Sequence, residues 1–290
     1  MEVKEVQEVK IVEPNFLAPA GIGQAFRGIG KAKTSLPVFN MIILGILAGV
    51  FIGFGGQLAT MVTFDMEKLF GVGFTKFIFG SVFSVGLMMV VIGGAELFTG
   101  NNLIFLGVLS GDVKLRRMLN NWFWVYFANF AGSILLAWIM YATELWKTGN
   151  LGEGIKALAI ANGKVTLSWG SAFARAIVCN WLVCMAVWMA TAAKDIVGKI
   201  FAIYFPIMAF VASGFEHSVA NMYFVPMGLL LKNNPQVVEA AGLTGKLSSL
   251  TWGGFIWKNL LPVTLGNIIG GAFFVATLYW MVYLRGKKEK

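Results

Sequence analysis

The sequence predicts an all-α membrane protein whose six transmembrane helices form an inverted 3+3 repeat, with broken second and fifth helices. First, 58% of its 290 residues are hydrophobic and only 13% are charged, which is too much apolar surface for a soluble domain. Second, long apolar runs alternate with charged loops. Third, two of these runs are interrupted midway by glycine and glutamate, which an uninterrupted membrane helix has no reason to contain.

Residues 1–37 are expected to form a cytoplasmic N-terminal segment. Within it, residues 15–35 combine apolar side chains with Arg27, Lys31 and Lys33, a pattern typical of a short amphipathic helix lying along the membrane surface. Residues 38–285 are expected to form the six-helix transmembrane domain, and residues 286–290 a cytoplasmic C-terminal tail.

Six apolar runs are long enough to cross the hydrocarbon core, which takes about 20 residues. They span residues 38–62, 74–109, 121–142, 173–193, 200–231 and 255–284. The second and fifth runs are too long for one straight crossing, in line with their interruptions. Pro262 is expected to kink the sixth, because proline removes a helix hydrogen bond.

The distribution of basic residues predicts the orientation in the membrane. Six crossings place both termini on one side, and the loops on that side hold 14 Lys and Arg residues against eight on the other. Because cytoplasmic loops are enriched in Lys and Arg, both termini are expected in the cytoplasm, with the protein in the plasma membrane.

The two halves of the chain resemble each other. Three residues recur at identical spacing: Asn121, Asn129 and Gly132 in the third run, and Asn259, Asn267 and Gly270 in the sixth. The second and fifth runs are also broken alike, at Glu96 and at Glu216. A chance match of Asn and Gly spacing is the alternative, but it does not explain two corresponding breaks. Inverted repeats with broken helices are common in transport proteins, which have their solute path where the breaks meet.

The breaks predict an anion-attracting site. A helix that starts at mid-membrane directs free N–H groups and the positive end of its dipole into the cavity. Glu96 and Glu216 would repel an anion, so we expect them to support the loops by accepting hydrogen bonds from N–H groups or from an asparagine. Thr99 and His217, the only histidine, remain for the pore, with Thr99 fixing the imidazole tautomer. The alternative for His217 is a plain helix–helix hydrogen bond.

Apolar side chains flank both breaks. Phe83 and Leu87 share one helix face, Phe210 lies two turns before His217, and Leu97 and Phe98 lie in the first break itself. Rings and aliphatic groups above and below a polar site would exclude water and bare ions. For any single one of them, ordinary core packing is the alternative.

Several other classes are excluded by missing residues. A single histidine and the absence of HExxH, CxxC or paired aspartates argue against an enzyme, and no cofactor or metal is expected. Cys179 and Cys184 are interpreted as packing residues. Nucleic-acid binding is not expected, because the basic residues are scattered among loops. Water channels use paired Asn-Pro-Ala loops and ammonium channels favour two pore histidines; neither feature occurs here. The net charge of +9 favours anionic lipid or solute as partners.

Four motifs carry a resemblance that covers nearly the whole chain. They are Ala95-Glu-Leu-Phe-Thr-Gly-Asn101, Cys179-Asn-Trp-Leu-Val-Cys184, Gly214-Phe-Glu-His-Ser-Val-Ala-Asn-Met222 and Asn259-Leu-Leu-Pro-Val-Thr-Leu-Gly-Asn267. With them the chain resembles the formate/nitrite transporter family. The resemblance implies a homopentamer in which each protomer has its own aquaporin-like pore.

The resemblance also implies roles for particular residues. His217 and Thr99 correspond to the central histidine and its threonine partner, Asn267 to a pore asparagine, and Asn180 to a second asparagine near the break. The implied constrictions are Phe83, Leu87, Leu97, Phe98, Val183 and Phe210, and the implied vestibule lysines are Lys33 and Lys164.

The expected function is transport of small monovalent weak-acid anions. Formate is the first choice, while nitrite, hydrosulfide and lactate remain open, and a neutral-solute channel is the alternative of a different class. A bare anion loses several kcal/mol or more of hydration in an apolar constriction, and the neutral acid far less. The anion is therefore expected to take a proton, from water or from His217, as its surroundings dry. The expected partners are the anion, a proton, membrane lipid and four further copies of the chain.

Overall fold

The computed structural model describes residues 14–286, so the predicted terminal segments fall partly outside the described residues. The described part is helical, and its only extended pairing is one bridge between Phe16 and Ala193. In chain order its helices are α1 (Pro19–Thr34), α2 (Val38–Thr63), α3 (Met66–Phe83), α4 (Val85–Gly93), α5 (Phe98–Asn101), α6 (Ile104–Leu109), α7 (Leu115–Ala142), η1 (Leu145–Lys147), α8 (Gly152–Val165), α9 (Trp169–Ala192), α10 (Ile196–Ala212), α11 (Ser218–Leu231), α12 (Pro235–Ala240), α13 (Trp252–Gly254), η2 (Phe255–Leu260), α14 (Leu261–Ile268), η3 (Ile269–Thr277) and α15 (Leu278–Tyr283).

These helices make the chain a multi-pass membrane protein. Within the described residues five helical stretches are long and apolar enough to cross a membrane: 38–63, 66–93, 115–142, 169–192 and 252–283. Three shorter apolar helices, at 98–109, 196–212 and 218–231, account for the remainder of the second predicted run and for the fifth. Each apolar run of the sequence therefore corresponds to helix in the structure.

Two helices end at glycine-containing segments in mid-run. After α4, Gly94 has φ +82°, and helix resumes only at Phe98. After α10, Gly214 has φ +77°, and helix resumes at Ser218. Positive φ is favourable for glycine and strained for most other residues, so these two positions end the helices where the sequence carries its glutamates.

The last span is continuous but irregular. The π-helical segment η2 ends at Leu260, two residues before Pro262, which is the second residue of α14, and η3 is a second π-helical segment. A change of helical register beside a proline is a usual way to accommodate its missing N–H.

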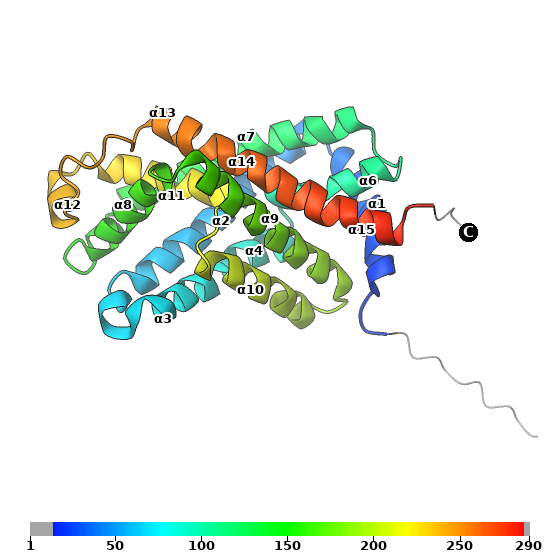
Figure 1. Ribbon diagram of the computed structural model, residues 1–290, viewed down its shortest axis with the longest axis horizontal. Helices are drawn as coiled ribbons and strands as arrows, with labels where there is room; N and C mark the ends of the chain where they lie inside the picture. The colour runs from blue at the N-terminus through cyan, green and yellow to red at the C-terminus, as the bar shows by residue number, and fades with distance from the viewer. Residues whose placement is uncertain (1–13, 287–290) are drawn as a thin grey trace, which may run out of the picture.

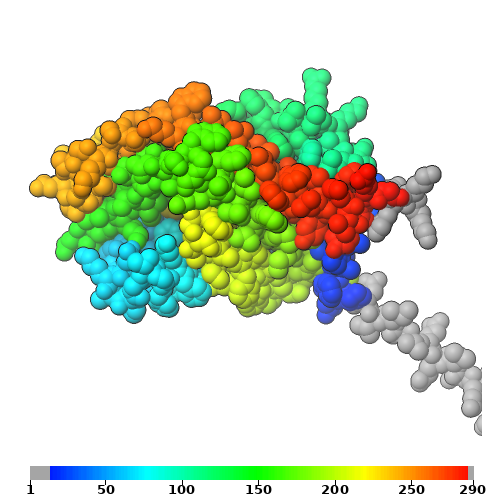
Figure 2. Space-filling view, in the orientation of Figure 1, coloured from blue at the N-terminus to red at the C-terminus, as the bar shows by residue number. Residues whose placement is uncertain are grey.

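Helices α1 and α8 occupy opposite ends of the molecule's long axis (Figure 1). Helix α1 packs near α6 and α15 at one end, and α8 lies with α12 and α3 at the other. In the space-filling view the α3 region, in cyan, borders the α8 region, in green (Figure 2). The helices between them form the body in which the two breaks are buried.

An ion cluster fastens α1 to the loop after α6. Arg27 Nη2 donates to Asp112 Oδ1 over 3.2 Å, and Lys31 Nζ lies 2.9 Å from the same oxygen. The hydrogen bond from Arg27 is the main reason that the pKa of Asp112 is lowered. A lowered folded-state pKa stabilises the fold above the ordinary carboxyl pKa, and this contribution is lost as the pH falls through the folded-state value.

Asp112→Asn is therefore expected to lower the stability by about 1–2 kcal/mol at pH 7. Thermal melting of the detergent-solubilised protein should show the variant's deficit shrinking below the ordinary carboxyl pKa, 3.8. Asp65→Asn is the control, because Asp65 is exposed and its side chain caps no helix. Equal deficits for both variants would contradict the structural role of the cluster.

Candidate functional site

The two breaks meet at a contact between Thr99 and His217. Thr99 Oγ1 lies 2.8 Å from His217 Nε2, and both side chains are buried. His217 Nδ1 accepts the backbone N–H of Ala220 over 3.0 Å. Because Nδ1 is an acceptor, the proton of the neutral imidazole is on Nε2 and is donated to Thr99. The tautomer is thus set by the first turn of α11, whereas the sequence suggested that Thr99 sets it.

At the first break a buried glutamate organises four polar groups. Glu96 accepts a hydrogen bond from Asn101 Nδ2 over 2.7 Å and from Lys33 Nζ over 2.6 Å. Asn101 Nδ2 also donates to Asn121 Oδ1, and Asn121 Nδ2 donates to the carbonyl oxygen of Lys33. The glutamate therefore accepts from a nearby asparagine, as expected, and in addition carries an ion pair.

The second break repeats this network. Glu216 accepts from Asn221 Nδ2 over 2.7 Å and from Lys164 Nζ over 3.1 Å. Asn221 Nδ2 also donates to Asn259 Oδ1, and Asn259 Nδ2 donates to the carbonyl oxygen of Lys164. Each lysine charge is compensated by the glutamate of its break, so these lysines are not isolated cations.

Sequence reasoning missed Asn101 and Asn221. A signal was present, because each lies five residues after the glutamate of its break, so Glu-x4-Asn occurs once in each half. Their roles depend on partners from other helices, which no local pattern describes.

An asparagine on a later helix holds the start of each half-helix. Asn129 Oδ1 accepts the N–H of Phe98 over 2.9 Å, and Asn267 Oδ1 accepts the N–H of Ser218 over 2.9 Å. Their Nδ2 atoms donate to the carbonyl oxygens of the two break glutamates over 2.8 and 3.0 Å. Asn267 thus bonds the backbone, and its contact with a solute stays a prediction.

Asn180 holds the Thr99 peptide from another side. Its Nδ2 lies 3.2 Å from the carbonyl oxygen of Thr99 and 2.9 Å from Asn102 Oδ1. Cys184 Sγ also donates to the Thr99 carbonyl oxygen over 3.4 Å. Cys179 and Cys184 are free and buried, as packing residues should be.

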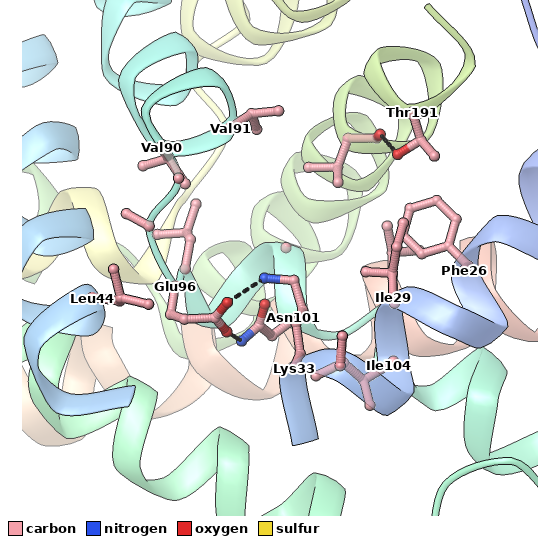
Figure 3. Close-up of a pocket in the computed structure, with 18 of the residues that line it drawn as sticks. Phe26, Ile29, Lys33, Leu44, Val90, Val91, Glu96, Asn101, Ile104 and Thr191 are labelled. Atoms are coloured by element: carbon pink, nitrogen blue, oxygen red, sulfur yellow. Dashed lines mark hydrogen bonds and ion pairs between the residues drawn. The ribbon is translucent and has the colours of Figure 1, made fainter. Parts of the chain in front are cut away.

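Each break lines one cavity, and His217 lines the second of the two. The first, about 460 Å³, is lined by α1 and the first break and includes Lys33, Leu87 and Leu97. Figure 3 shows Lys33 and Asn101 directed at Glu96 within it, with Phe26 and Ile29 of α1 opposite. We call it the α1 cavity.

The second cavity, about 230 Å³, is lined by α8 and the second break; we call it the α8 cavity. It includes Phe83, Phe210, Lys164 and His217. The remaining predicted constriction residues, Phe98 and Val183, are buried but line neither of these two cavities. Phe98 packs edge-on against Tyr126 at a ring distance of 4.9 Å.

Fold and site define a helical, multi-pass membrane protein with a buried polar contact between two interrupted helices and a cavity at each of the two breaks. The family described as formate/nitrite transporter matches residues 21–281. The chain belongs to this family. Its members are transporters and channels, in agreement with the prediction that this protein is not an enzyme.

Similar proteins carry related names. A "Probable formate transporter" of Methanothermobacter thermautotrophicus is 44% identical over 286 residues, covering 93% of this chain and 98% of that protein. The "Formate channel FocA" of Escherichia coli K12 is 36% identical, covering 93% and 96%. A solved "Pentameric formate channel with formate bound" superposes with a TM-score of 0.76 at 37% identity, covering 86% of this chain and 98% of that one.

Proposed function

We propose that this protein carries small monovalent weak-acid anions, formate first among them, across the plasma membrane through a pore centred on Thr99 and His217. The observation that carries the proposal is their buried 2.8 Å contact, which joins two half-helix starts whose breaks each line one cavity. The names of the similar proteins, and the formate bound in one of them, support formate over nitrite, hydrosulfide or lactate.

The proposed architecture is an inverted 3+3 repeat with an aquaporin-like protomer and both termini in the cytoplasm. Support comes from the pairing of equivalent contacts, Lys33–Glu96 with Lys164–Glu216. The α1 cavity then opens to the cytoplasm and the α8 cavity to the outside. A homopentamer is proposed because the similar solved channel is pentameric.

Transport in this proposal depends on a change of protonation. The two half-helix starts attract the anion into a cavity. Leu87 and Leu97 on one side, and Phe83 and Phe210 on the other, form the constrictions, with Phe98 and Val183 supporting them. Losing water there raises the proton affinity of the anion. It takes a proton, from water or from His217, and passes as the neutral acid, which loses far less hydration than the anion.

The polar residues of the breaks have separate proposed roles. Thr99 accepts the Nε2 proton of His217, so its own hydroxyl proton can be donated to the passing solute. Asn180 and Asn267 hold the polypeptide backbone around Thr99 and His217 and contribute to the pore wall. Glu96 and Glu216 support the loops and anchor the vestibule lysines Lys33 and Lys164.

Formate uptake into proteoliposomes of the purified protein, with and without an inward proton gradient, tests the proposal. Saturable uptake that the gradient drives uphill means that formate and a proton move together. Uptake that follows only the formate gradient means a channel. If formate is not taken up while nitrite, hydrosulfide or lactate is, the site stands and the substrate changes; uptake of none of the four contradicts the function.

His217→Phe is expected to lower formate flux about tenfold, which corresponds to about 1.4 kcal/mol of lost stabilisation at the central contact. It should also remove the pH dependence of the flux. The control is Thr191→Val in the α1 cavity, where the hydroxyl bonds only its own helix, at the carbonyl oxygen of Val187. Unchanged pH dependence in His217→Phe would rule out a direct proton role for the histidine.

A further inference from the structure

The two cavities differ in the balance of positive and negative side chains in their walls. In the α1 cavity the charged lining residues are Lys33 and Glu96, which form an ion pair at 2.6 Å. In the α8 cavity they are Lys164 and Glu216, paired at 3.1 Å, and also Lys156. Among the described lining residues, the α8 cavity therefore has one positive charge without a negative counterpart in its wall.

Lys156 lies on the face of α8 that lines this cavity. Lys156, Ile160 and Lys164 follow at intervals of four residues, so they share one face of the helix, and all three line the cavity. The acidic partner of Lys156 is Glu67 on the neighbouring helix α3; Lys156 Nζ and Glu67 Oε2 are 3.5 Å apart. This contact joins the two helices that border each other in Figure 2.

The Lys156–Glu67 pair differs from the Lys164–Glu216 pair in its exposure to water. The Glu67 side chain is 53% exposed, whereas that of Glu216 is 5% exposed. Glu216 is also held by Asn221 and Asn259. Exposed ion pairs contribute little and are screened by salt. A small anion that enters the α8 cavity can therefore replace the Glu67 carboxylate at the Lys156 ammonium.

We propose that Lys156 is an anion-capture residue of the α8 cavity: its ammonium binds the incoming monovalent anion before the anion reaches the desolvating constriction at Phe83 and Phe210. This inference rests on the proposed anion transport and adds to it a residue that determines apparent affinity. The fixed Lys164–Glu216 pair shapes the cavity, while Lys156 supplies the charge that an anion can use.

The test compares half-saturating formate concentrations in proteoliposomes of the full chain. For an anion in contact with the ammonium, about 4 Å away in water, Coulomb attraction changes its local concentration about fivefold. Lys156→Gln is therefore expected to raise the half-saturating concentration up to about fivefold at low ionic strength, with little change in maximal flux, and the difference should fade in high salt. Lys156→Arg should retain the wild-type value, and Glu67→Gln should lower it.

Lys147→Gln is the matched control. Lys147 is paired with Glu144 at 2.7 Å and does not line the α8 cavity, so the same loss of charge should leave the half-saturating concentration unchanged. Equal shifts in Lys156→Gln and Lys147→Gln, or no shift in Lys156→Gln while the wild type transports formate, overturn the role of Lys156 alone. A wild type that transports no weak-acid anion overturns the proposed function, and this inference with it.

Discussion

Gly270→Ala is expected to prevent normal folding or to destabilise the protein by about 3 kcal/mol or more. A Cβ atom at Gly270 would lie 2.2 Å from the carbonyl oxygen of Ile177 on α9. The clashing atom belongs to the backbone of a packed helix, so no side-chain rotation can relieve the contact. In a membrane, where small residues allow helices to pack closely, separating η3 from α9 would also displace the adjacent Asn267.

Gly132→Ala should have the same effect in the first half of the chain, where its Cβ would lie 2.1 Å from the carbonyl oxygen of Ile46. Gly170→Ala on α9 is the control, because a Cβ there meets nothing within 4 Å. Where no clash results, replacing a helical glycine by alanine raises the free energy of unfolding by about 1 kcal/mol. Yield and thermal melting in detergent measure all three variants. A Gly270→Ala protein that melts like the wild type would refute the close helix contact.

Glu216→Gln is expected to cost about 3–5 kcal/mol, because it leaves the Lys164 ammonium without its counter-charge inside the protein. Lys164 and Glu216 side chains are only 15% and 5% exposed. Glutamine still accepts the hydrogen bond from Asn221, so the substitution removes charge more than shape. Thermal melting of the solubilised protein measures the loss.

A double-mutant cycle isolates the ion pair. The double variant Glu216→Gln/Lys164→Gln should be more stable than Glu216→Gln alone, since no buried charge is then unpaired. The control is Glu144→Gln in the exposed pair with Lys147, which should cost less than about 1 kcal/mol. Additive losses in the double variant would mean that Glu216 stabilises the break without its partner lysine.

The site contains residues that hold the two breaks in shape and residues proposed to act on the solute. Glu96, Glu216 and their asparagines determine whether the breaks hold their shape, so their substitution should reduce stability. His217 and Lys156 line the α8 cavity, and Thr99 contacts His217, so substitution of these three should change flux, its pH dependence or the apparent affinity. A variant such as His217→Phe is therefore informative only when its melting temperature is measured beside its flux.

The sequence by itself determined the class of the protein, its apolar runs and the position of both breaks. Hydrophobicity over about 20 residues is a local property of the sequence, and it decides by itself whether a segment can span the hydrocarbon core. Gly94 with Glu96, and Gly214 with Glu216, are likewise local signals, because glycine and charge are out of place within an apolar run. For the same reason His217 was identifiable as a candidate site residue without any structure.

Other features were decided by the tertiary structure. Helix α8 was not predicted, because it lies in the loop between the third and fourth apolar runs and its sequence is rich in glycine and alanine. The lysine partners of the break glutamates were not predictable either: Lys33 lies 63 residues from Glu96, and Lys164 lies 52 residues from Glu216. The assignment of Leu87 and Leu97 to one cavity, and of Phe83 and Phe210 to the other, also required the fold.

The physical reason is the range of the interactions involved. Hydrophobic runs, glycines and isolated charges act through the solvent or the local backbone, so their effect can be inferred from neighbours in sequence. The 2.8 Å contact between Thr99 and His217 joins residues 118 positions apart, and it exists only because the two breaks lie next to each other in the fold. Sequence determines that the helices break, and packing determines that the breaks meet.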